Sequence, residues 1–312
     1  MSHENVILVG LDGSDAALHA LDWATQEARV RQWGLRLVCS YALPSFAAAS
    51  LDGGYAALDD SAIRAGAEAV LTEALARVAG SGLPVTSHVA VGDATAVLVD
   101  ESREVGLVVV GTRGGGGFAE RLLGTVSSAL PAHAKCPTVV VPLRAARGAQ
   151  EPTDAPVPPV TPVRRVMVGV DGSPQSELAL RCALREARRW QATVVVVSAV
   201  PVNTVTGVLA WLPEPVDHRA VLADIEESLA LVLERVADEA QGLTIERRVL
   251  DGTGAAVLTG MSGEADLLVV GSRGRGGFTG LLLGSTSQAV LHHAQCPVLV
   301  VTKGVDAEQA AA

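Results

Sequence analysis

The sequence predicts an α/β protein of two tandem domains, each with a five-stranded, doubly wound parallel sheet of the Rossmann-like kind. One observation behind this prediction is a duplication: residues 5–24 align with 165–184, and residues 111–125 align with 271–285. Another is that apolar, strand-like runs alternate with helix-like segments in both halves, which is typical of parallel sheets covered by helices. The repeat of about 160 residues has the size of a whole domain.

Each element of the first half has its own signal. Strands are short apolar runs, and the first helix carries Leu18, Leu21 and Ala28 on one face. In chain order we expect strand Val6–Leu11, helix Ser14–Arg31, strand Leu35–Tyr41, helix Ala62–Val78, strand Val85–Val91, helix Ala94–Arg103, strand Leu107–Val110, helix Gly124–Ala134 and strand Thr138–Val141.

The second half repeats this order from Val166. Its first helix starts at Ser173 and Pro174, a hydroxyl N-cap followed by proline at the first helical position. The runs 194–197 (VVVV) and 267–270 (LLVV) fit strands that are buried on both faces. In such sheets, ligands bind beyond the carboxyl ends of the strands, where the strand order reverses, so the loops after strands one, two and four are the candidate positions.

The domain boundaries follow from the repeat and from composition. We assign residues 1–147 to the first domain, 148–162 to a proline-rich linker, 163–304 to the second domain and 305–312 to a disordered tail. Trp33 aligns with Trp190, and Gly92 aligns with Gly252. The chain is 49% hydrophobic but only 3% aromatic, which predicts aliphatic cores of Val, Leu and Ala.

Composition excludes several function classes. The formal net charge is -10 and only two lysines occur, so the chain lacks the basic face that duplex DNA or RNA needs. The opening residues have no basic, apolar leader, and no uncharged run reaches the ~18 residues of a membrane span. We therefore expect a cytoplasmic protein with no nucleic-acid or membrane partner.

The cysteines have no zinc-site spacing, and Cys136 and Cys296 are expected to be buried structural thiols.

The loop after strand four carries the strongest functional signal. In both halves it reads Gly, two residues, Gly, nine residues, Gly and a hydroxyl residue, at Gly111, Gly114, Gly124 and Thr125 and again at Gly271, Gly274, Gly284 and Ser285. Glycines let the backbone approach a ligand closely, and amides at a helix start bind anionic oxygens. The Gly-Lys pair of a P-loop is absent, and a dinucleotide fingerprint would follow strand one. A plain flexible turn is the remaining alternative.

Further side chains near the Gly loop are candidates for binding the same ligand. Asp12 and Asp171 end strand one and suit a ribose hydroxyl or a base amine, although a helix-capping role is open to them. Arg113 and Arg273 lie inside the Gly loops as candidate phosphate cations or as solvated side chains. The hydroxyls of Ser127 and Ser287, in the first turn of the next helix, are placed to reach the same phosphates.

With these motifs the chain resembles a tandem universal stress protein of the ATP-binding type, a family with an adenine nucleotide α-hydrolase-like fold. The family motif G-x2-G-x9-G-[ST] follows a strand that opens with Asp. The second half matches at Asp266, whereas Gly106 takes that place in the first half, where we expect a cost in local structure and not in binding. The closing C-P-[VT]-x-V-V of residues 136–141 and 296–301 is also similar to the family's last strand.

The resemblance implies roles by position. Asp12 and Asp171 would contact the adenine–ribose end, and Ala42 and Ala199, at the end of strand two, would lie against adenine. The loop glycines would surround the ribose and phosphates, with Thr125, Ser127, Ser285 and Ser287 at the phosphates. The last strand of each half would pair the halves as an internal pseudo-dimer, and a homodimer of whole chains stays open.

The function expected is an ATP-binding, nucleotide-responsive regulator of stress response or dormancy. It would hold one ATP per half, with Mg2+ on the phosphates, and would act through an unknown protein partner, not as an enzyme. Alternatives are a slow ATPase or ATP-using enzyme of the related nucleotide-hydrolase group, a scaffold with vestigial sites, and a module for another nucleotide such as cyclic AMP. The second loop has Arg275 where the first has Gly115, and Gly280-Leu281 where the first has Glu120-Arg121, which predicts tighter ATP binding in the second half.

Overall fold

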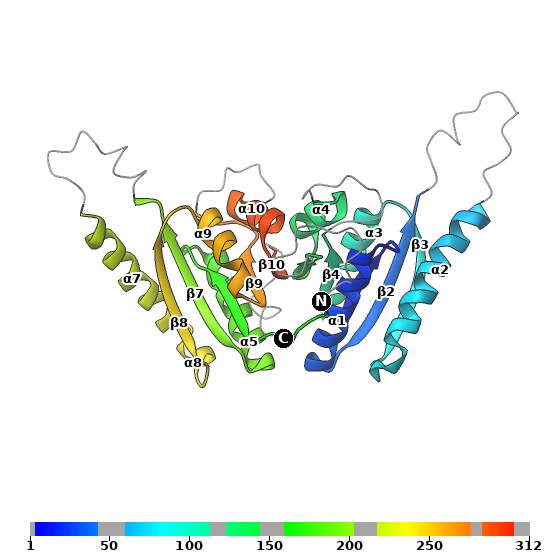
Figure 1. Ribbon diagram of the computed structural model, residues 1–312, viewed down its shortest axis with the longest axis horizontal. Helices are drawn as coiled ribbons and strands as arrows, with labels where there is room; N and C mark the ends of the chain where they lie inside the picture. Colours follow the sequence, from blue (N-terminus) through cyan, green and yellow to red (C-terminus); the bar gives the residue numbers. More distant parts are fainter. Residues whose placement is uncertain are drawn as a thin grey trace, which may run out of the picture.

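The computed structural model describes residues 4–42, 60–112, 123–143, 159–202, 217–275 and 283–302. The first half contains β1 (Glu4–Leu11), α1 (Asp15–Arg31), β2 (Gly34–Tyr41), α2 (Asp60–Val78), β3 (Val85–Val91), α3 (Ala94–Glu101), β4 (Val105–Gly111), α4 (Thr125–His133) and β5 (Thr138–Val141) (Figure 1). The second contains β6 (Arg165–Gly169), α5 (Pro174–Trp190), β7 (Thr193–Val200), α7 (His218–Glu234), α8 (Ala237–Ala240), β8 (Ile245–Asp251), α9 (Gly254–Met261), β9 (Leu267–Gly271), α10 (Ser285–His293) and β10 (Val298–Val301). The expected order of elements is confirmed in both halves. The tail 305–312 and most of the linker, residues 148–158, lie outside the described residues.

All the strands join one ten-stranded sheet in the order β3-β2-β1-β4-β5-β10-β9-β6-β7-β8. Within each half the neighbouring strands are parallel. Among the described strands the one antiparallel pair is β5 with β10, where Leu299 faces Val139, so the last strands join the two halves as the resemblance implied. Each half is thus a doubly wound α/β unit, and the joint removes two open sheet edges.

Helices cover both faces of this sheet (Figure 1). On one face, strand side chains such as Ile7 and Val166 pack with apolar residues of α1, α2, α5 and α7. On the other face, Leu8 and Met167 pack with residues of α3, α4, α9 and α10. Both cores are built mainly from Val, Leu and Ala, as the composition predicts. Because every strand near the joint is buried on both faces, its sequence is a continuous apolar run.

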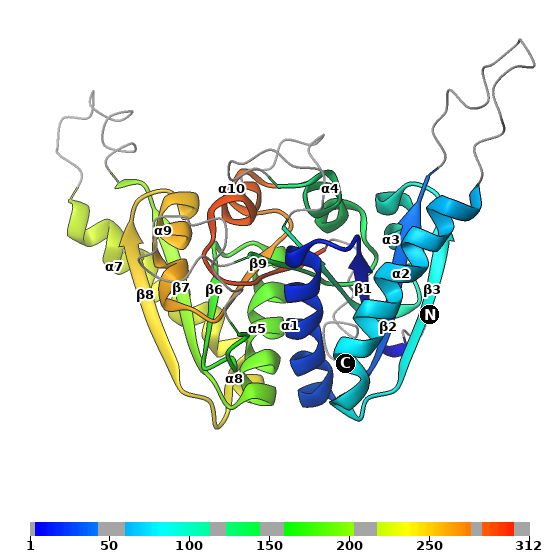
Figure 2. The same ribbon diagram turned by 45° about the vertical axis from the view of Figure 1, so that its right-hand side comes forward.

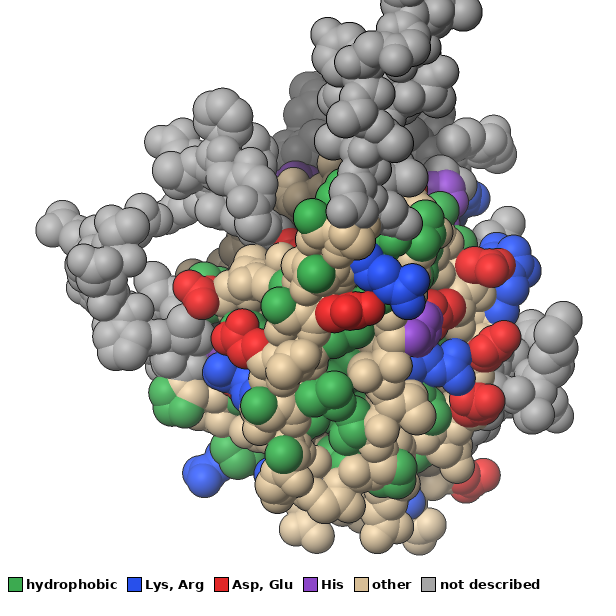
Figure 3. Space-filling view, turned by 90° about the vertical axis from the view of Figure 1, so that its right-hand side faces the viewer, with side chains coloured by type: hydrophobic (Ala, Val, Ile, Leu, Met, Phe, Trp, Pro, Cys, Tyr) green, Lys and Arg blue, Asp and Glu red, His purple; other side chains and the backbone are tan. Residues whose placement is uncertain are grey.

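The outer surface of the first half carries charge of both signs. Arg36 of β2, for example, forms ion pairs with Glu4 and Glu104 at 2.6 and 3.0 Å. On the face shown in Figure 3, acidic and basic side chains lie interspersed rather than gathered by sign. Such pairs are partly exposed and contribute little to stability, typically ~0–1 kcal/mol each.

Backbone geometry fixes the alignment of the two halves. Gly92 and Gly252 both have positive φ, 143° and 136°, so glycine is required at the same turn in each half. Helices α1 and α5 end at Gln32 and Gln191, which have left-handed φ values of 59° and 55°. These caps are structural equivalents, so Trp190, one residue before its cap, matches Arg31. The sequence alignment of Trp33 with Trp190 is therefore wrong by two residues.

The Gly106 departure has a local cause. In the second half, Asp266 accepts hydrogen bonds from the backbone N–H groups of Arg164 and Arg165 at 2.9 and 3.0 Å. In the first half, the Trp33 ring occupies this corner, and a Cβ at Gly106 would lie 2.5 Å from it. Gly106 therefore accommodates a bulky ring instead of forming the carboxylate contacts.

Replacing Gly106 tests this packing. We expect Gly106→Ala to destabilise the chain by about 1–3 kcal/mol, because the new methyl group overpacks a site already filled by the indole. The measurement is urea unfolding followed by circular dichroism. Gly66→Ala is the matched control, since a Cβ there meets nothing within 4 Å. Equal stability of the two variants would contradict the steric explanation.

Candidate functional site

Each half has a cavity at the carboxyl ends of its strands, where the strand order reverses. In the first half the loops after β1 and β4 leave the sheet in opposite directions, and in the second half the loops after β6 and β9 do so. This is the crevice at which doubly wound sheets bind ligands. The positions expected from the sequence are therefore brought together.

The second-half cavity has a volume of about 470 Å³. Among the residues with side chains or backbone on its wall are Asp171, Ala199, Gly271, Arg273, Gly274, Gly284, Ser285 and Ser287. The described wall of the first-half cavity encloses about 170 Å³ and includes Asp12, Gly111, Gly124, Thr125 and Ser127. Arg113 and Gly114, with Gly115, Glu120 and Arg121, lie outside the described residues, as do Gly280 and Leu281.

The helices that follow the Gly loops begin without a side-chain cap. Gly124 and Gly284 are the N-caps of α4 and α10, and no side chain of either cap accepts a hydrogen bond from the first turn. Their backbones are extended, with φ of -69° and -74°, which any residue can adopt. A Cβ at Gly284 would find its nearest atom at 3.5 Å, an ordinary contact. Neither conformation nor packing against the described residues therefore requires glycine at position 284.

Serine, threonine, aspartate and asparagine are the preferred N-caps because they satisfy the free amides of the first turn. Glycine leaves those amides, and the positive end of the helix dipole, open to the cavity. An anionic group that lies against the α10 N-terminus would use both the amides and the space that a side chain would fill.

Other loop glycines are required by the chain itself. At Gly271 a Cβ would lie 2.8 Å from the Gln175 side chain, and at Gly111 it would lie 2.6 Å from the Ala16 carbonyl oxygen. At Gly274 it would lie 2.3 Å from Oδ2 of Asp171. These glycines let the Gly loop pass close to the first helix of each half, which shapes the cavity floor.

Asp12 and Asp171 do not cap the following helices. Ser14 and Ser173 do so, accepting hydrogen bonds from the N–H groups of Ala17 and Ser176 at 3.2 Å each. Asp12 accepts from the N–H and hydroxyl of Ser14 at 3.1 and 2.6 Å. This turn places the carboxylate beside the cavity, so the capping alternative for the two aspartates is excluded.

Asp171 also holds the second Gly loop. Its carboxylate accepts hydrogen bonds from the backbone N–H groups of Ser173 and Arg275, both at 2.9 Å. Burial by itself would raise the pKa of Asp171, but the hydrogen bonds from Ser173 and Arg275 outweigh it and lower that pKa. The ionised carboxylate therefore joins the loop after β6 to the Gly loop after β9.

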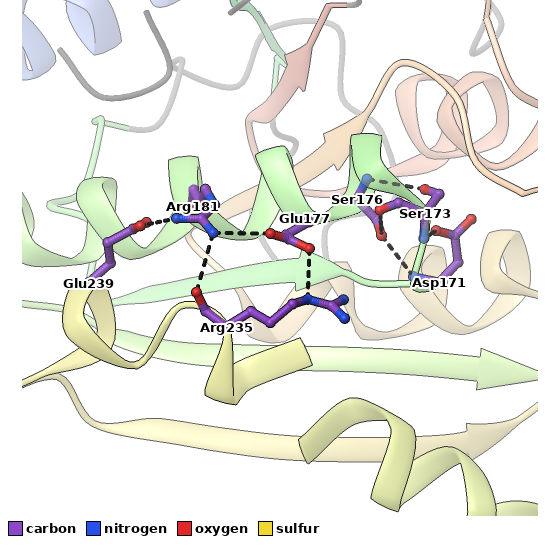
Figure 4. A network of polar contacts seen from close by, with 7 residues as sticks. All are labelled: Asp171, Ser173, Ser176, Glu177, Arg181, Arg235 and Glu239. Carbon is purple, nitrogen blue, oxygen red and sulfur yellow. Dashed lines mark hydrogen bonds and ion pairs between the residues drawn. The ribbon is translucent and has the colours of Figure 1, made fainter. Parts of the chain in front are cut away.

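A polar network fixes the helix behind Asp171 (Figure 4). The Asp171 N–H donates to Oγ of Ser176 at 3.3 Å. On the same helix, Glu177 accepts from Arg181 and Arg235 at 3.0 Å each, and Arg181 also pairs with Glu239. This network ties the start of α5 to the end of α7 and to α8.

The hydroxyl groups of the loop divide into two kinds. Ser127 and Ser287 are buried, and their hydroxyls donate to the carbonyl oxygens of Thr112 and Gly271 at 2.8 and 2.7 Å. Each proton is thus directed to the backbone of the Gly loop, so these side chains hold the loop in this conformation. Thr125 and Ser285 are exposed at the cavities and form no hydrogen bond through their hydroxyls to any described residue.

Two arginines supply positive charge to the second cavity. Arg273 and Arg275 both lie on its wall, and neither guanidinium forms a hydrogen bond to the part of the chain that the structure describes. The Arg275 guanidinium lies over Gly172, where a Cβ would be 2.4 Å from it. The Arg275 backbone is thus tied to Asp171 while its guanidinium lies against Gly172.

The first-half residue that matches Ala199 at the end of strand two is Ser40, not Ala42. Ala199 lies on the cavity wall, but the wall residue at the matching register in the first half is Ser40. The registers agree, because Gly10 pairs with Val38 and Gly169 pairs with Val197, two residues earlier in each strand. Ala42 lies beyond the end of β2 and is not on the described wall, so its match to Ala199 is wrong by two residues.

Sequence reasoning missed the apolar side of the cavities. Leu98 and Leu258, from α3 and α9, form part of the two walls. A Cβ at Gly10 or Gly169 would lie 2.8 or 2.6 Å from these leucines, so the two glycines let the leucines pack on the strands. In the sequence, the only indication of this packing is the glycine repeated near the end of strand one, Gly10 and Gly169.

The described residues contain no group of three or more His, Cys, Asp or Glu side chains arranged to hold a metal ion. The cysteines are buried free thiols, as expected for Cys136 and Cys296, and burial raises the pKa of Cys136 above its usual range. No helix in the described part of the chain is both long and apolar enough to cross a bilayer.

Known proteins share this architecture. A universal stress protein from Archaeoglobus fulgidus superposes with a TM-score of 0.66 at 20% identity, covering 96% of this chain and 97% of that one. Among curated proteins, universal stress protein Rv2623 of Mycobacterium tuberculosis is 35% identical over 315 residues, covering 96% of this chain and 97% of its own. Universal stress protein Rv1996 of the same species is 34% identical, with 94% of each chain covered. The family model matches residues 5–142 and 162–302. The chain belongs to the universal stress protein family, with one family unit in each half.

Proposed function

We propose that each half binds an adenine nucleotide, with ATP as the ligand, and that the protein is a nucleotide-responsive regulator of stress response or dormancy. The observation that carries this proposal is the uncapped start of α10 at Gly284. That glycine is required by neither backbone conformation nor packing against the part of the chain that the structure describes, yet it opens the first-turn amides to the cavity. A phosphate group explains both features.

The cavity also suits the rest of a nucleotide. Asp171, Ser285 and the start of α10 lie on its wall, and Val197, Ala199 and Leu258 supply apolar wall. A flat base on the apolar wall, a ribose at Asp171 and phosphates at the helix start would use each part. Arg273 and Arg275 would balance the phosphate charge.

Mg2+ belongs to this proposal only as the counterion of the phosphates. The described residues provide hydroxyls at Thr125 and Ser285 but no carboxylate cluster at the phosphate end. A cation that keeps several waters and binds mainly through phosphate oxygens fits this donor set.

A regulatory role is favoured over strong catalysis. The described walls of the two cavities contain Asp12, Asp171 and arginines, but no His, Cys, Lys or Glu. Asp171 has a lowered pKa and already accepts hydrogen bonds from Ser173 and Arg275, so it is a weak candidate for a general base. Slow hydrolysis of a bound triphosphate remains the second candidate activity.

Bound nucleotide can be identified directly. Freshly purified protein is denatured, and the released nucleotide is identified and counted by chromatography. We expect ATP at about two per chain, as follows from two uncapped helix starts. ADP or AMP would favour slow turnover, and displacement of ATP by cyclic AMP in a competition panel would favour the other nucleotide. Absence of nucleotide together with no uptake of Mg-ATP would refute the proposal and leave a scaffold with vestigial sites.

A further inference from the structure

A buried cluster of charged side chains lies where the two halves meet. Helices α1 and α5 pack side by side across the pseudo-two-fold axis (Figure 2). Glu27 and Glu186 are 0% and 1% exposed, and the Arg31 side chain is 6% exposed. Charged groups are almost never buried so deeply unless they are paired. The stability of the α1–α5 contact therefore depends strongly on the pairing within this cluster.

The cluster is nearly symmetric. Counted from the equivalent caps Gln32 and Gln191, Glu27 of α1 corresponds to Glu186 of α5, and Arg31 corresponds to Trp190. The contacts cross the interface in both directions: Arg31 donates to Glu186, and Trp190 Nε1 donates to Glu27 at 2.8 Å. The symmetry therefore brings two carboxyl groups together in a buried interface.

Glu27 and Glu186 differ in the positively charged side chains that contact them. Oε1 of Glu186 accepts from both Arg31 and Arg189, the latter at 2.9 Å. Glu27 accepts from Nε of Arg31 at 2.5 Å and, on its other oxygen, from the neutral indole of Trp190. The substitution of Trp for Arg between the halves thus gives Glu186 the larger share of positive charge.

One acceptor in the cluster lacks a donor. Oε2 of Glu186 is buried and accepts no hydrogen bond from the described residues. Glu27 and Glu186 share the Arg31 guanidinium, so a proton on Glu27 would remove the repulsion between two buried negative charges and would supply the donor that Oε2 of Glu186 lacks.

We propose that the contact between the halves holds one proton between Glu27 and Glu186, and that release of this proton weakens the contact. The interface is then a proton-binding site as well as a packing surface. None of its residues lies on the described wall of either cavity.

The titration of the pair agrees with this geometry. Burial and the nearby Glu186 raise the pKa of Glu27 to about 7, against the opposing effect of Arg31. For Glu186, burial is outweighed by Arg31, Arg189 and Arg185, and its pKa is lowered. The Cys182 thiol on the same helix has a raised pKa and stays neutral. The proton therefore belongs to Glu27.

An acid whose folded-state pKa is raised contributes stability that is fully present below its unfolded value of 4.5 and is lost as pH rises through about 7. The contribution of Glu27 to the melting temperature should thus fall between pH 5 and pH 8, against the opposite contribution of His19, whose pKa burial lowers.

Glu27→Gln tests the proposal, because glutamine is a neutral stand-in for the protonated acid. We expect the variant to lose most of the decline in melting temperature between pH 5 and pH 8 and to melt above the unmodified chain at pH 8. Glu68→Gln, in an exposed pair with Arg64, is the control and should keep the decline. A decline unchanged in Glu27→Gln would overturn the proposal.

A second measurement needs no variant. Infrared spectra of the native, unmodified chain should show the carbonyl band of a protonated carboxylic acid at pH 6 and its loss by pH 8. Absence of that band at pH 6 would also overturn the proposal, even if Glu27→Gln failed to fold.

Discussion

Gly284→Asp is expected to abolish nucleotide binding in the second half while leaving the chain folded. The new Cβ meets no atom of the described residues closer than 3.5 Å, and an aspartate is a favourable cap for α10. The same carboxylate would occupy the first-turn amides and repel a phosphate, so we expect at least a 100-fold loss of affinity, roughly 2.7 kcal/mol or more. Titration calorimetry with Mg-ATP measures this loss.

Three variants distinguish the effect of the added charge, the effect of the added volume and the contribution of each half. Gly284→Ala adds only the methyl group that the protein can accept, so its loss of affinity should be much smaller. Gly124→Asp makes the equivalent change in the first half. Because Arg275 makes the second site more positive, Gly284→Asp should remove the tighter component of binding and Gly124→Asp the weaker one. If Gly124→Asp removes the tighter component, the assigned difference between the sites is wrong.

Arg31→Met is expected to have the largest effect on stability, a loss of about 3–5 kcal/mol at pH 8. Methionine keeps the apolar stem, but the variant removes the cation shared by Glu27 and Glu186 and the contact of its guanidinium, 4.6 Å from the Trp33 ring centre. Two buried carboxylates would then face each other without their common partner. Urea unfolding at pH 8 measures the loss.

The matched control is Arg64→Met, which breaks an exposed pair with the same spacing of four residues. We expect a change below about 0.5 kcal/mol there. The loss in Arg31→Met should also shrink at pH 5, because Glu27 is then protonated and one of the two repelling charges is gone. Similar losses in the two variants, or a loss independent of pH, would show that the buried cluster is not electrostatically important.

The sequence predicted the fold because the relevant signals are local. The strand Val85–Val91 is bounded by turn residues at both ends, and the strand Thr138–Val141 is a short apolar run after proline, so both bounds agree with the structure. The duplicated glycines likewise predicted the position of the cavities. Spacing along the chain carries this kind of information well.

Contacts between distant residues were less predictable. Glu27 and Arg31 look like an ordinary exposed helical pair, and only the packing of α1 on α5 shows that Glu186 completes the cluster. Ala42 was misplaced because nothing in the sequence fixes the register of the second strand end to better than two residues. The hydroxyl protons of Ser127 and Ser287 are committed to loop carbonyls, a choice that depends on how the loop folds back.

The antiparallel joint between β5 and β10 closes within one polypeptide. Its formation is therefore a first-order process, and dilution does not separate the halves as it would separate two subunits. Each chain carries one cavity in each half, so the two kinds of cavity are present in equal numbers at every expression level. Each cavity is also encoded by its own stretch of gene, so a substitution in one is not copied into the other, and the pair can evolve different affinities for the same ligand.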